Sequence, residues 1–340
     1  MKNNPNSIKI KRPLPIFTLI TTIFCLLFSN IVFGASVDKA KKVQVLINQT
    51  AKHPALDMAI KGIIASLSDS GYKVGDNLEI SIEDSQVSAA LSQQIASKFV
   101  GKAMEENTVV VGVGTIAAQS FLKYTKLGKV KMVFSAVTDP VGAGLVNSIQ
   151  KPGGNISGVS DFVELEPQLI LFKKLLPSLK KLGILYNPGD QNSVSIVDEL
   201  EVLCPKYNLV LVKQTANKTT DIVQAATKLS QISDALIISN DNNALSAMQS
   251  VIKSYNKPVF SSDTDTIDGT GAVAALGPNQ FQVGWQTGKM IARILRGANI
   301  ATEHVEFPQT TELYIDLKAA KKLGMVIPRD IIAQAAKVIE

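Results

Sequence analysis

Acidic and hydroxyl side chains follow two similar apolar runs in this chain of 340 residues. Residues 131–140 read KMVFSAVTDP and residues 257–265 read KPVFSSDTD, so Thr138-Asp139 and Thr264-Asp265 close the two runs at the same spacing. The pair Asp263 and Asp265 could share a proton as catalytic carboxylates do, but no general acid or nucleophile stands beside it in the sequence. Acids at strand ends fit the capture of a ligand ammonium equally well.

Other polar clusters stand at the ends of predicted strands in the same way. They are Asn48–Thr50 and Gly114-Thr115 in the first half, and Asn187–Asp190 and Asn240–Asn243 in the second. Open parallel sheets bind ligands beyond the carboxyl ends of their strands. The polar residues therefore mark one edge of each predicted sheet as a binding wall.

The elements that position these groups alternate between strand and helix, which is typical of parallel βαβ units. In the first half we predict strands at 43–47, 78–82, 109–111 and 132–134, with helices at 55–70, 87–104 and 117–124. In the second half we predict strands at 182–186, 209–212, 235–238 and 259–260, with helices at 194–203, 220–232 and 244–255. The order of elements is the same in both halves, and this indicates an internal repeat of one α/β lobe.

Two such lobes with facing strand ends would enclose a ligand between them. The tail departs from the repeat, with a strand at 271–276, a helix at 280–295 and an extended segment at 305–317. We therefore expect three crossing segments that form a hinge. The expected boundaries are residues 35–155 with 270–304 for lobe 1, and residues 156–269 with 305–340 for lobe 2.

The net charge of +6 comes mainly from the N-terminus, because residues 1–34 hold four basic residues and no acid. The other charges are scattered, so we expect no nucleic-acid interface. A basic flank at 9–12, an apolar stretch at 14–33 and small residues before Ala35 are typical of a secretory leader over 1–34. An uncleaved anchor is the alternative, since the stretch is just long enough to span a bilayer. Cleavage would leave Cys204 as the only thiol, so no intramolecular disulfide could form.

The sequence gives little indication of a dinucleotide cofactor, a metal site or a catalytic site. Gly112–Ala117 fits the G-x-G-x-x-G/A pattern, but it follows the third strand of its lobe and no acidic residue closes the next strand. The two histidines, His53 and His304, form no pattern with metal-ligand spacing, and His53 before Pro54 is expected to cap or pack a helix start. We predict no cofactor, no metal and no catalytic activity.

Seven segments together resemble the periplasmic substrate-binding proteins of ABC importers, in the branch that includes the tryptophan/tyrosine type. They are His53–Asp57, Thr138–Gly144, Lys151–Asp161, Leu185–Ser193, Asp263–Asp265, Ala274–Gly277 and Leu317–Gly324. The resemblance implies an α/β type I periplasmic-binding-protein fold with two similar doubly wound parallel-sheet lobes that close on a small ligand. It also implies a monomeric periplasmic protein that delivers its ligand to permease subunits with a cytoplasmic ATPase. A periplasmic sensing module for a signalling system is the alternative function.

We further expect a zwitterionic amino acid to lie between the lobes. Thr115, Asn192 and Ser193, with backbone N–H groups at helix starts, are expected to bind its carboxylate. Its ammonium would face Asp263 or Asp241. Members of the family often carry an aromatic and an acidic residue just before the segment at 53–57, whereas this chain has Thr50-Ala51-Lys52. An aromatic ligand would therefore lose a stacking contact. The remaining predicted ligand-binding residues are Thr50, Thr138 and Asp139.

Overall fold

The computed structural model describes residues 42–103 and 107–340. The predicted leader over 1–34 lies outside these residues. Within the described ranges, no helix combines the length and the apolar character that a membrane span requires.

The first sheet consists of five parallel strands in the order β2-β1-β3-β4-β5. They are β1 (Val43–Gln49), β2 (Leu78–Asp84), β3 (Thr108–Val113), β4 (Lys131–Ser135) and β5 (Ile156–Val159). The central strand β3 has the sequence TVVVGV and every residue in it is buried. Such continuous apolar runs are typical of strands covered by helices on both faces.

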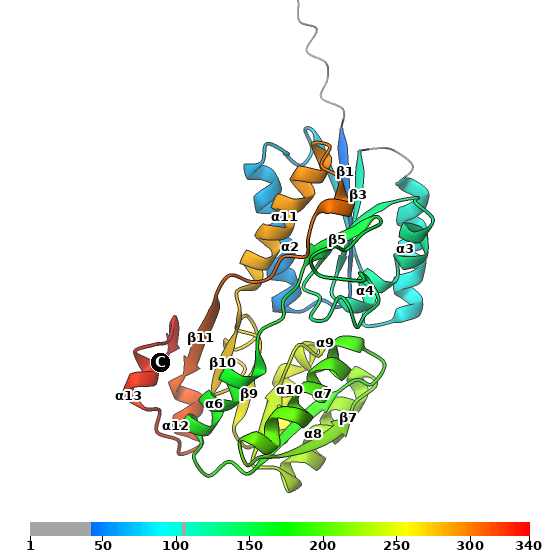
Figure 1. Cartoon of the computed structure of the whole chain (residues 1–340). Coiled ribbons are helices and arrows are strands. Elements are labelled where there is room, and N and C mark those ends of the chain that lie inside the picture. The colour runs from blue at the N-terminus through cyan, green and yellow to red at the C-terminus, as the bar shows by residue number, and fades with distance from the viewer. Residues whose placement is uncertain (1–41, 104–106) are drawn as a thin grey trace, which may run out of the picture. The chain divides into compact units, whose positions relative to one another are not determined.

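Helices cover both faces of this sheet (Figure 1). They are α2 (Pro54–Asp69), α3 (Ala89–Lys102), α4 (Thr115–Gln119), α5 (Leu122–Lys126) and α11 (Gln280–Leu295). The helices α2 and α11 lie side by side at very short range, because a Cβ atom added to Gly284 would lie 1.8 Å from the carbonyl oxygen of Ala59. Glycine at this position therefore allows the C-terminal part of the chain to return to the first lobe.

The second sheet repeats the order of the first. Its strands run β7-β6-β8-β9-β10, followed by β11 and β12. They are β6 (Lys181–Tyr186), β7 (Val210–Thr215), β8 (Ala235–Ile238), β9 (Val259–Ser261), β10 (Ala274–Pro278), β11 (Thr311–Asp316) and β12 (Lys337–Ile339). Only the pair β10–β11 is antiparallel among the described strands. The shared order confirms the predicted fold class of two similar parallel-sheet α/β lobes.

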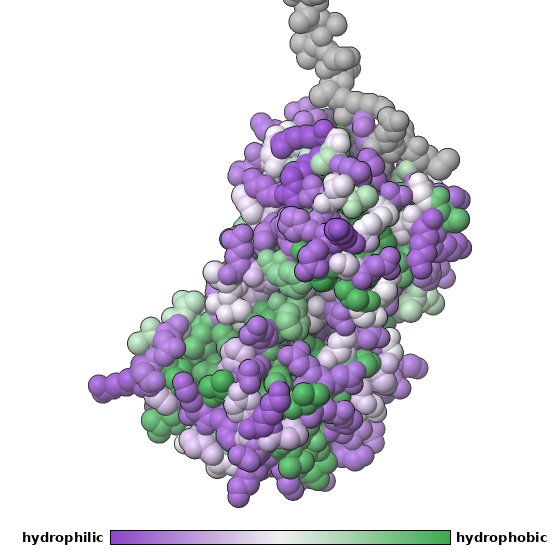
Figure 2. Space-filling view, viewed as in Figure 1, coloured by the Kyte–Doolittle hydropathy of each residue, from purple (hydrophilic) through white to green (hydrophobic). Residues whose placement is uncertain are grey.

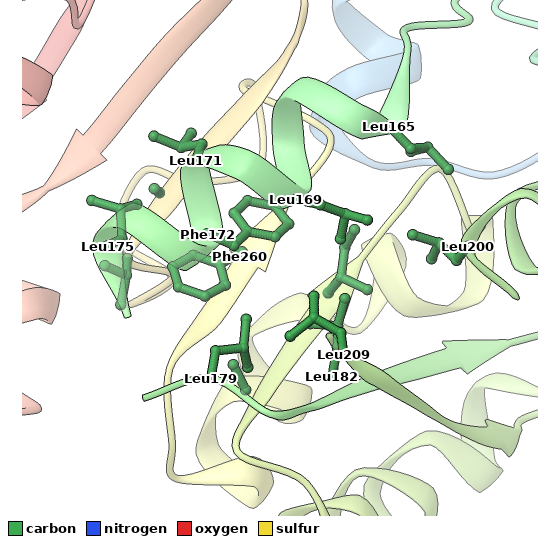
Figure 3. Close-up of a cluster of buried hydrophobic side chains, with 14 of the residues drawn as sticks. Leu165, Leu169, Leu171, Phe172, Leu175, Leu179, Leu182, Leu200, Leu209 and Phe260 are labelled. Carbon is green, nitrogen blue, oxygen red and sulfur yellow. The ribbon is translucent and has the colours of Figure 1, made fainter. Parts of the chain in front are cut away.

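The helices of the second lobe pack around this sheet. They are α6 (Leu165–Leu175), α7 (Gln191–Lys206), η2 (Thr219–Asp221), α8 (Ile222–Ile232), α9 (Asn242–Ser246), α10 (Met248–Tyr255), α12 (Leu317–Lys322) and α13 (Arg329–Ile332). Figure 3 shows Phe172 of α6 and Phe260 of β9 as a stacked pair of rings, with Leu169, Leu171 and Leu175 of α6 around them, and the ring centroids are 4.4 Å apart. This pair fixes α6 on the strand that ends at the predicted site.

The chain crosses between the sheets three times. The crossings follow β5, follow β10 and lie between η3 (Ile300–Thr302) and β11. The strand β5 pairs with β4 of the first sheet, and β10 pairs with β9 of the second. The expected lobe limits at 156 and 270 therefore fall before these two strands, whereas the structure places the first two crossings after them. The strand β5 was not predicted, and the strand predicted at 271–276 was assigned to the first lobe, whereas it pairs with β9 of the second sheet.

Candidate functional site

A narrow pocket, with a cavity volume of only about 10 Å³, lies between the carboxyl ends of the two sheets. The first lobe contributes His53, Ala55, Leu56, Ala136 and Thr138; the second contributes Asn192, Asn240, Asn242, Leu245 and Asp263; the crossings contribute Asp161 and Gln280. No lysine or arginine lines the pocket among the described residues. The site therefore combines two carboxylates, several amides and a short apolar wall.

Two buried carboxylates form the acidic end of the pocket. Asp161 accepts hydrogen bonds from Thr138 Oγ1 at 2.9 Å, from Asn240 Nδ2 at 3.1 Å and from Gln280 Nε2 at 3.5 Å. Burial raises the pKa of Asp161, while these donors oppose the rise. Asp161 is thus a carboxylate whose donors come from both lobes.

Asp263 is the less satisfied of the two carboxylates. Its Oδ1 accepts a hydrogen bond from the backbone N–H of Thr266 at 2.9 Å, but its Oδ2 has no partner among the described residues. The side chain is fully buried, and burial together with the nearby charge of Asp265 raises the pKa of Asp263 to about 7. A buried carboxylate oxygen of this kind is stabilised when a cation reaches it.

Four amide side chains line the pocket, and each donates a hydrogen bond through its nitrogen to a neighbouring group. Asn192 Nδ2 donates to the carbonyl oxygen of Asn240 at 2.6 Å, and the side-chain nitrogens of Asn240 and Gln280 donate to Asp161. Their oxygens, Asn192 Oδ1, Asn240 Oδ1 and Gln280 Oε1, have no partner within the described part of the chain. Together with Asp263 Oδ2 they favour a ligand group that donates several hydrogen bonds and carries positive charge.

Two long helices begin at the pocket. The helix α2 starts with Pro54, followed by Ala55 and Leu56, which line the pocket, and it has no side-chain cap among the described residues. The helix α7 starts at Gln191, also without a side-chain cap there, and places Asn192 in the pocket. N–H groups in the first turn of a helix lack intrahelical acceptors, so such ends attract an anion.

Three of the residues predicted from the sequence line the pocket: Thr138, Asn192 and Asp263. A fourth, Asp139, lies in a groove next to it and accepts a hydrogen bond from Ser195 Oγ at 2.8 Å. This hydrogen bond joins the first lobe to α7 of the second. The groove is lined mainly by apolar residues, and hydrophobic residues gather where the lobes adjoin on the face drawn in Figure 2.

The structure corrects the roles expected of Asp241 and Ser193. Asp241 caps α9 by accepting from the N–H of Ala244 at 2.8 Å, and it also accepts from the N–H of Asn187 at 2.8 Å. Ser193 Oγ donates to the same carboxylate. Neither residue lines the pocket, because both side chains form hydrogen bonds that hold the strand ends behind it.

The two remaining predicted residues also lie outside the lining of the pocket. Thr50 Oγ1 accepts a hydrogen bond from the N–H of Ala117 at 3.0 Å and so fixes the first turn of α4 against β1. Thr115 is buried in that same turn, and its Oγ1 has no partner in the described residues. Thr50 and Thr115 therefore shape the wall of the first lobe and do not face the pocket.

Sequence reasoning missed Asp161 and Gln280, placed Asn240 and Asn242 only within a polar cluster at a strand end, and expected His53 to cap or pack a helix start. His53 Nε2 lies 3.2 Å from Asn242 Oδ1, so this contact also joins the two lobes. Asp161 follows β5, a strand that was not predicted, and Gln280 is the first residue of α11. The acidic residue after a short apolar run, Ile156–Val159, was the available signal.

The family described as ABC transporter substrate binding protein matches residues 43–339. The chain belongs to this family. A tyrosine-binding protein from Clostridioides difficile (strain R20291) is 35% identical over 291 residues, which cover 85% of this chain and 83% of that protein. The family binds substrates and does not convert them, which confirms the prediction that this substrate-binding protein is not an enzyme.

Two solved structures of similar proteins differ in whether a ligand is bound. A domain from Streptococcus pneumonia in complex with L-Trp is 31% identical, with a TM-score of 0.82 over 88% of this chain and 100% of that one. A ligand-free, open substrate-binding protein from Clostridium difficile is 30% identical, but its TM-score is 0.64 over 87% of this chain and 99% of that one. This substrate-binding protein therefore resembles the L-Trp complex more than the open form, and its fold is the predicted type I fold.

Proposed function

We propose that this substrate-binding protein captures an amino acid with an aromatic side chain and delivers it to the permease of an ABC importer. The main support for this proposal is the state of Asp263. Its carboxylate is fully buried, and its Oδ2 lacks a partner among the described residues. The described lining of the pocket supplies other acceptors but no lysine or arginine. An α-ammonium supplies three donors and one positive charge, which is what this arrangement demands. The relatives named above bind tyrosine or are seen with L-Trp.

The rest of the pocket suits the other parts of such a ligand. The carboxylate would lie at the uncapped start of α2, near the N–H groups of Ala55 and Leu56. The side chain would lie against Leu56, Ala136 and Leu245. No Phe, Tyr or Trp lines the pocket among the described residues, so the ligand ring finds no ring to stack on. The missing contact would cost about 0.5–1.5 kcal/mol of binding free energy.

Ligand binding would favour closure because the ligand contacts both lobes only in the closed state. The hydrogen bonds from Ser195 to Asp139 and from Asn240 to Asp161 would form as the lobes approach and would support the closed state. Export through a cleaved leader, periplasmic location and a monomeric state complete the proposal, together with the permease and its cytoplasmic ATPase.

A panel of free L-amino acids tests the ligand class. We expect a thermal upshift with tyrosine, tryptophan or both, and isothermal titration should then give a one-to-one complex. Asp76→Asn is a matched control for substitutions at the acidic end, since Asp76 is exposed and lies on the loop before β2. If no amino acid shifts the unfolding temperature while sugars or other solutes do, the proposed ligand class is wrong.

A further inference from the structure

We propose that His53 is a specificity-determining residue whose Nδ1 accepts a hydrogen bond from a donor on the ligand ring, such as a phenol O–H or an indole N–H. The inference rests on the function proposed above and adds to it a reason to discriminate among aromatic amino acids.

The hydrogen bonds of Asn242 determine which ring nitrogen of His53 carries the proton. Asn242 Nδ2 donates to Asp190 Oδ2 at 3.2 Å, so the other amide atom, Oδ1, is the one that faces His53 Nε2 at 3.2 Å. An amide oxygen only accepts hydrogen bonds, and His53 Nε2 must therefore be the donor. The neutral ring with its proton on Nε2 leaves Nδ1 as a bare acceptor.

The surroundings of His53 favour this neutral form. The side chain is 4% exposed, and burial lowers the pKa of His53 although Asn242, Asp57 and Asp84 act in the opposite direction. Nδ1 is buried and has no hydrogen-bond partner within residues 42–103 and 107–340. A buried acceptor without a donor is costly, and a ligand that brings the donor removes that cost.

The backbone holds His53 in place before any ligand arrives. Pro54 restricts the preceding residue to extended geometry, and His53 has φ −153° and ψ 162°. His53 is also the N-cap residue of α2, yet its side chain makes no capping hydrogen bond. The ring is thus not used to cap the helix, and it lines the pocket beside the apolar residues Ala55, Leu56 and Leu245.

The acidic end and His53 then recognise two different parts of the ligand. Asp263 and Asp161 suit the ammonium, and His53 Nδ1 suits a donor on the ring. Phenylalanine is tyrosine without the hydroxyl, so it would leave Nδ1 unsatisfied. We expect tyrosine to bind about 10- to 100-fold more tightly than phenylalanine, since sites built to bind a hydroxyl reject the analogue that lacks it.

The test is the ratio of the dissociation constants for phenylalanine and tyrosine, measured by isothermal titration. In His53→Gln the side-chain amide can still donate to Asn242, but the acceptor at the position of Nδ1 is gone. The ratio should fall to near one, mainly through weaker tyrosine binding. His304→Gln is the matched control, because His304 is exposed and outside the pocket, and it should keep the wild-type ratio.

A second measurement needs no variant at the site. The chain has two histidines, so nitrogen-15 signals of the His53 ring can be assigned by comparison with His304→Gln. Tyrosine should shift the Nδ1 signal of His53 in the direction of hydrogen-bond acceptance, and phenylalanine should not. Equal binding of both amino acids by the wild type, or an unchanged ratio in His53→Gln, would overturn the role of His53 and leave the proposed function intact. If the wild type binds no amino acid, the proposed function itself fails.

Discussion

Replacing Asp263 with asparagine should weaken ligand binding and at the same time stabilise the ligand-free protein. The amide has nearly the same shape and can still accept from the N–H of Thr266, so packing should be preserved. What changes is the charge at a fully buried position. Removing one partner of a buried ion pair costs about 3–5 kcal/mol, and we take the lower end because Asp161 remains as a second carboxylate. Affinity should fall roughly 100-fold.

Asp263→Asn should weaken ligand binding but should raise the free energy of unfolding of the ligand-free protein. The pKa of Asp263 is raised to about 7 in the folded ligand-free protein, so its ionised form destabilises the fold above that pH. A rise of this size lowers the free energy of unfolding by at most about 4 kcal/mol. At pH 8, Asp263→Asn should therefore unfold at a higher temperature than the wild type without ligand.

Calorimetry gives both quantities on the same samples. Titration at pH 8 with the amino acid that binds best measures the affinity, and scanning without ligand measures the stability. Asp76→Asn should change neither, since Asp76 is exposed. An unchanged affinity in Asp263→Asn, or a lower unfolding temperature without ligand, would refute the assignment of Asp263 to the ligand ammonium.

Contacts outside the acidic end of the pocket can be perturbed in the same way. Ser195→Ala removes the hydrogen bond to Asp139 that joins the lobes outside the pocket. The affinity for the ligand should fall about 5- to 10-fold, although no contact with the ligand is lost. Small-angle X-ray scattering at saturating ligand should still show the closed form. The free energy of unfolding of the ligand-free protein should fall as the pH rises from about 4 to about 7, because burial raises the pKa values of Asp190 and Asp263 to about 7. Urea titrations measure this free energy at each pH. A free energy of unfolding that increases over this pH range would contradict the burial of these two carboxyl groups. Gly284→Ala should destabilise by about 1–3 kcal/mol because the added methyl meets the backbone of α2, whereas Gly101→Ala, which meets nothing, should be neutral or stabilising; equal effects would argue against the close packing of α2 and α11.

The sequence predicted the lobes well because their strands are continuous apolar runs separated by helices of ordinary length. It missed β5 and α6, and the reasons are local. The strand β5 has only four residues, including Gly158, where a Cβ atom would lie 2.3 Å from the carbonyl oxygen of Phe134. The helix α6 contains Pro167 in its first turn, where proline is tolerated because the N–H would have no acceptor there. Short or proline-containing elements give weak periodic signals.

The site was harder to predict because several acids follow strands and only some of them face the pocket. Asp241 and Asp263 both stand at strand ends in the sequence, but Asp241 is the N-cap of α9 and bonds to the N–H of Ala244. A capping position can be recognised in sequence, and it would have argued against Asp241 as a ligand contact. Gln280 and Asp161 could not be found in this way, because the crossings of the chain decide where their side chains lie.

We propose that the acidic end of the pocket captures the ammonium of an amino acid. The most direct test is to titrate the protein with L-tyrosine and with 3-(4-hydroxyphenyl)propionate, which has the same ring and carboxylate but no amino group. L-tyrosine should bind, and the analogue should bind at least about 100-fold more weakly, because Asp263 and Asp161 then face no cation. Equal affinity for the two compounds would contradict the assignment of the acidic end to the ligand ammonium.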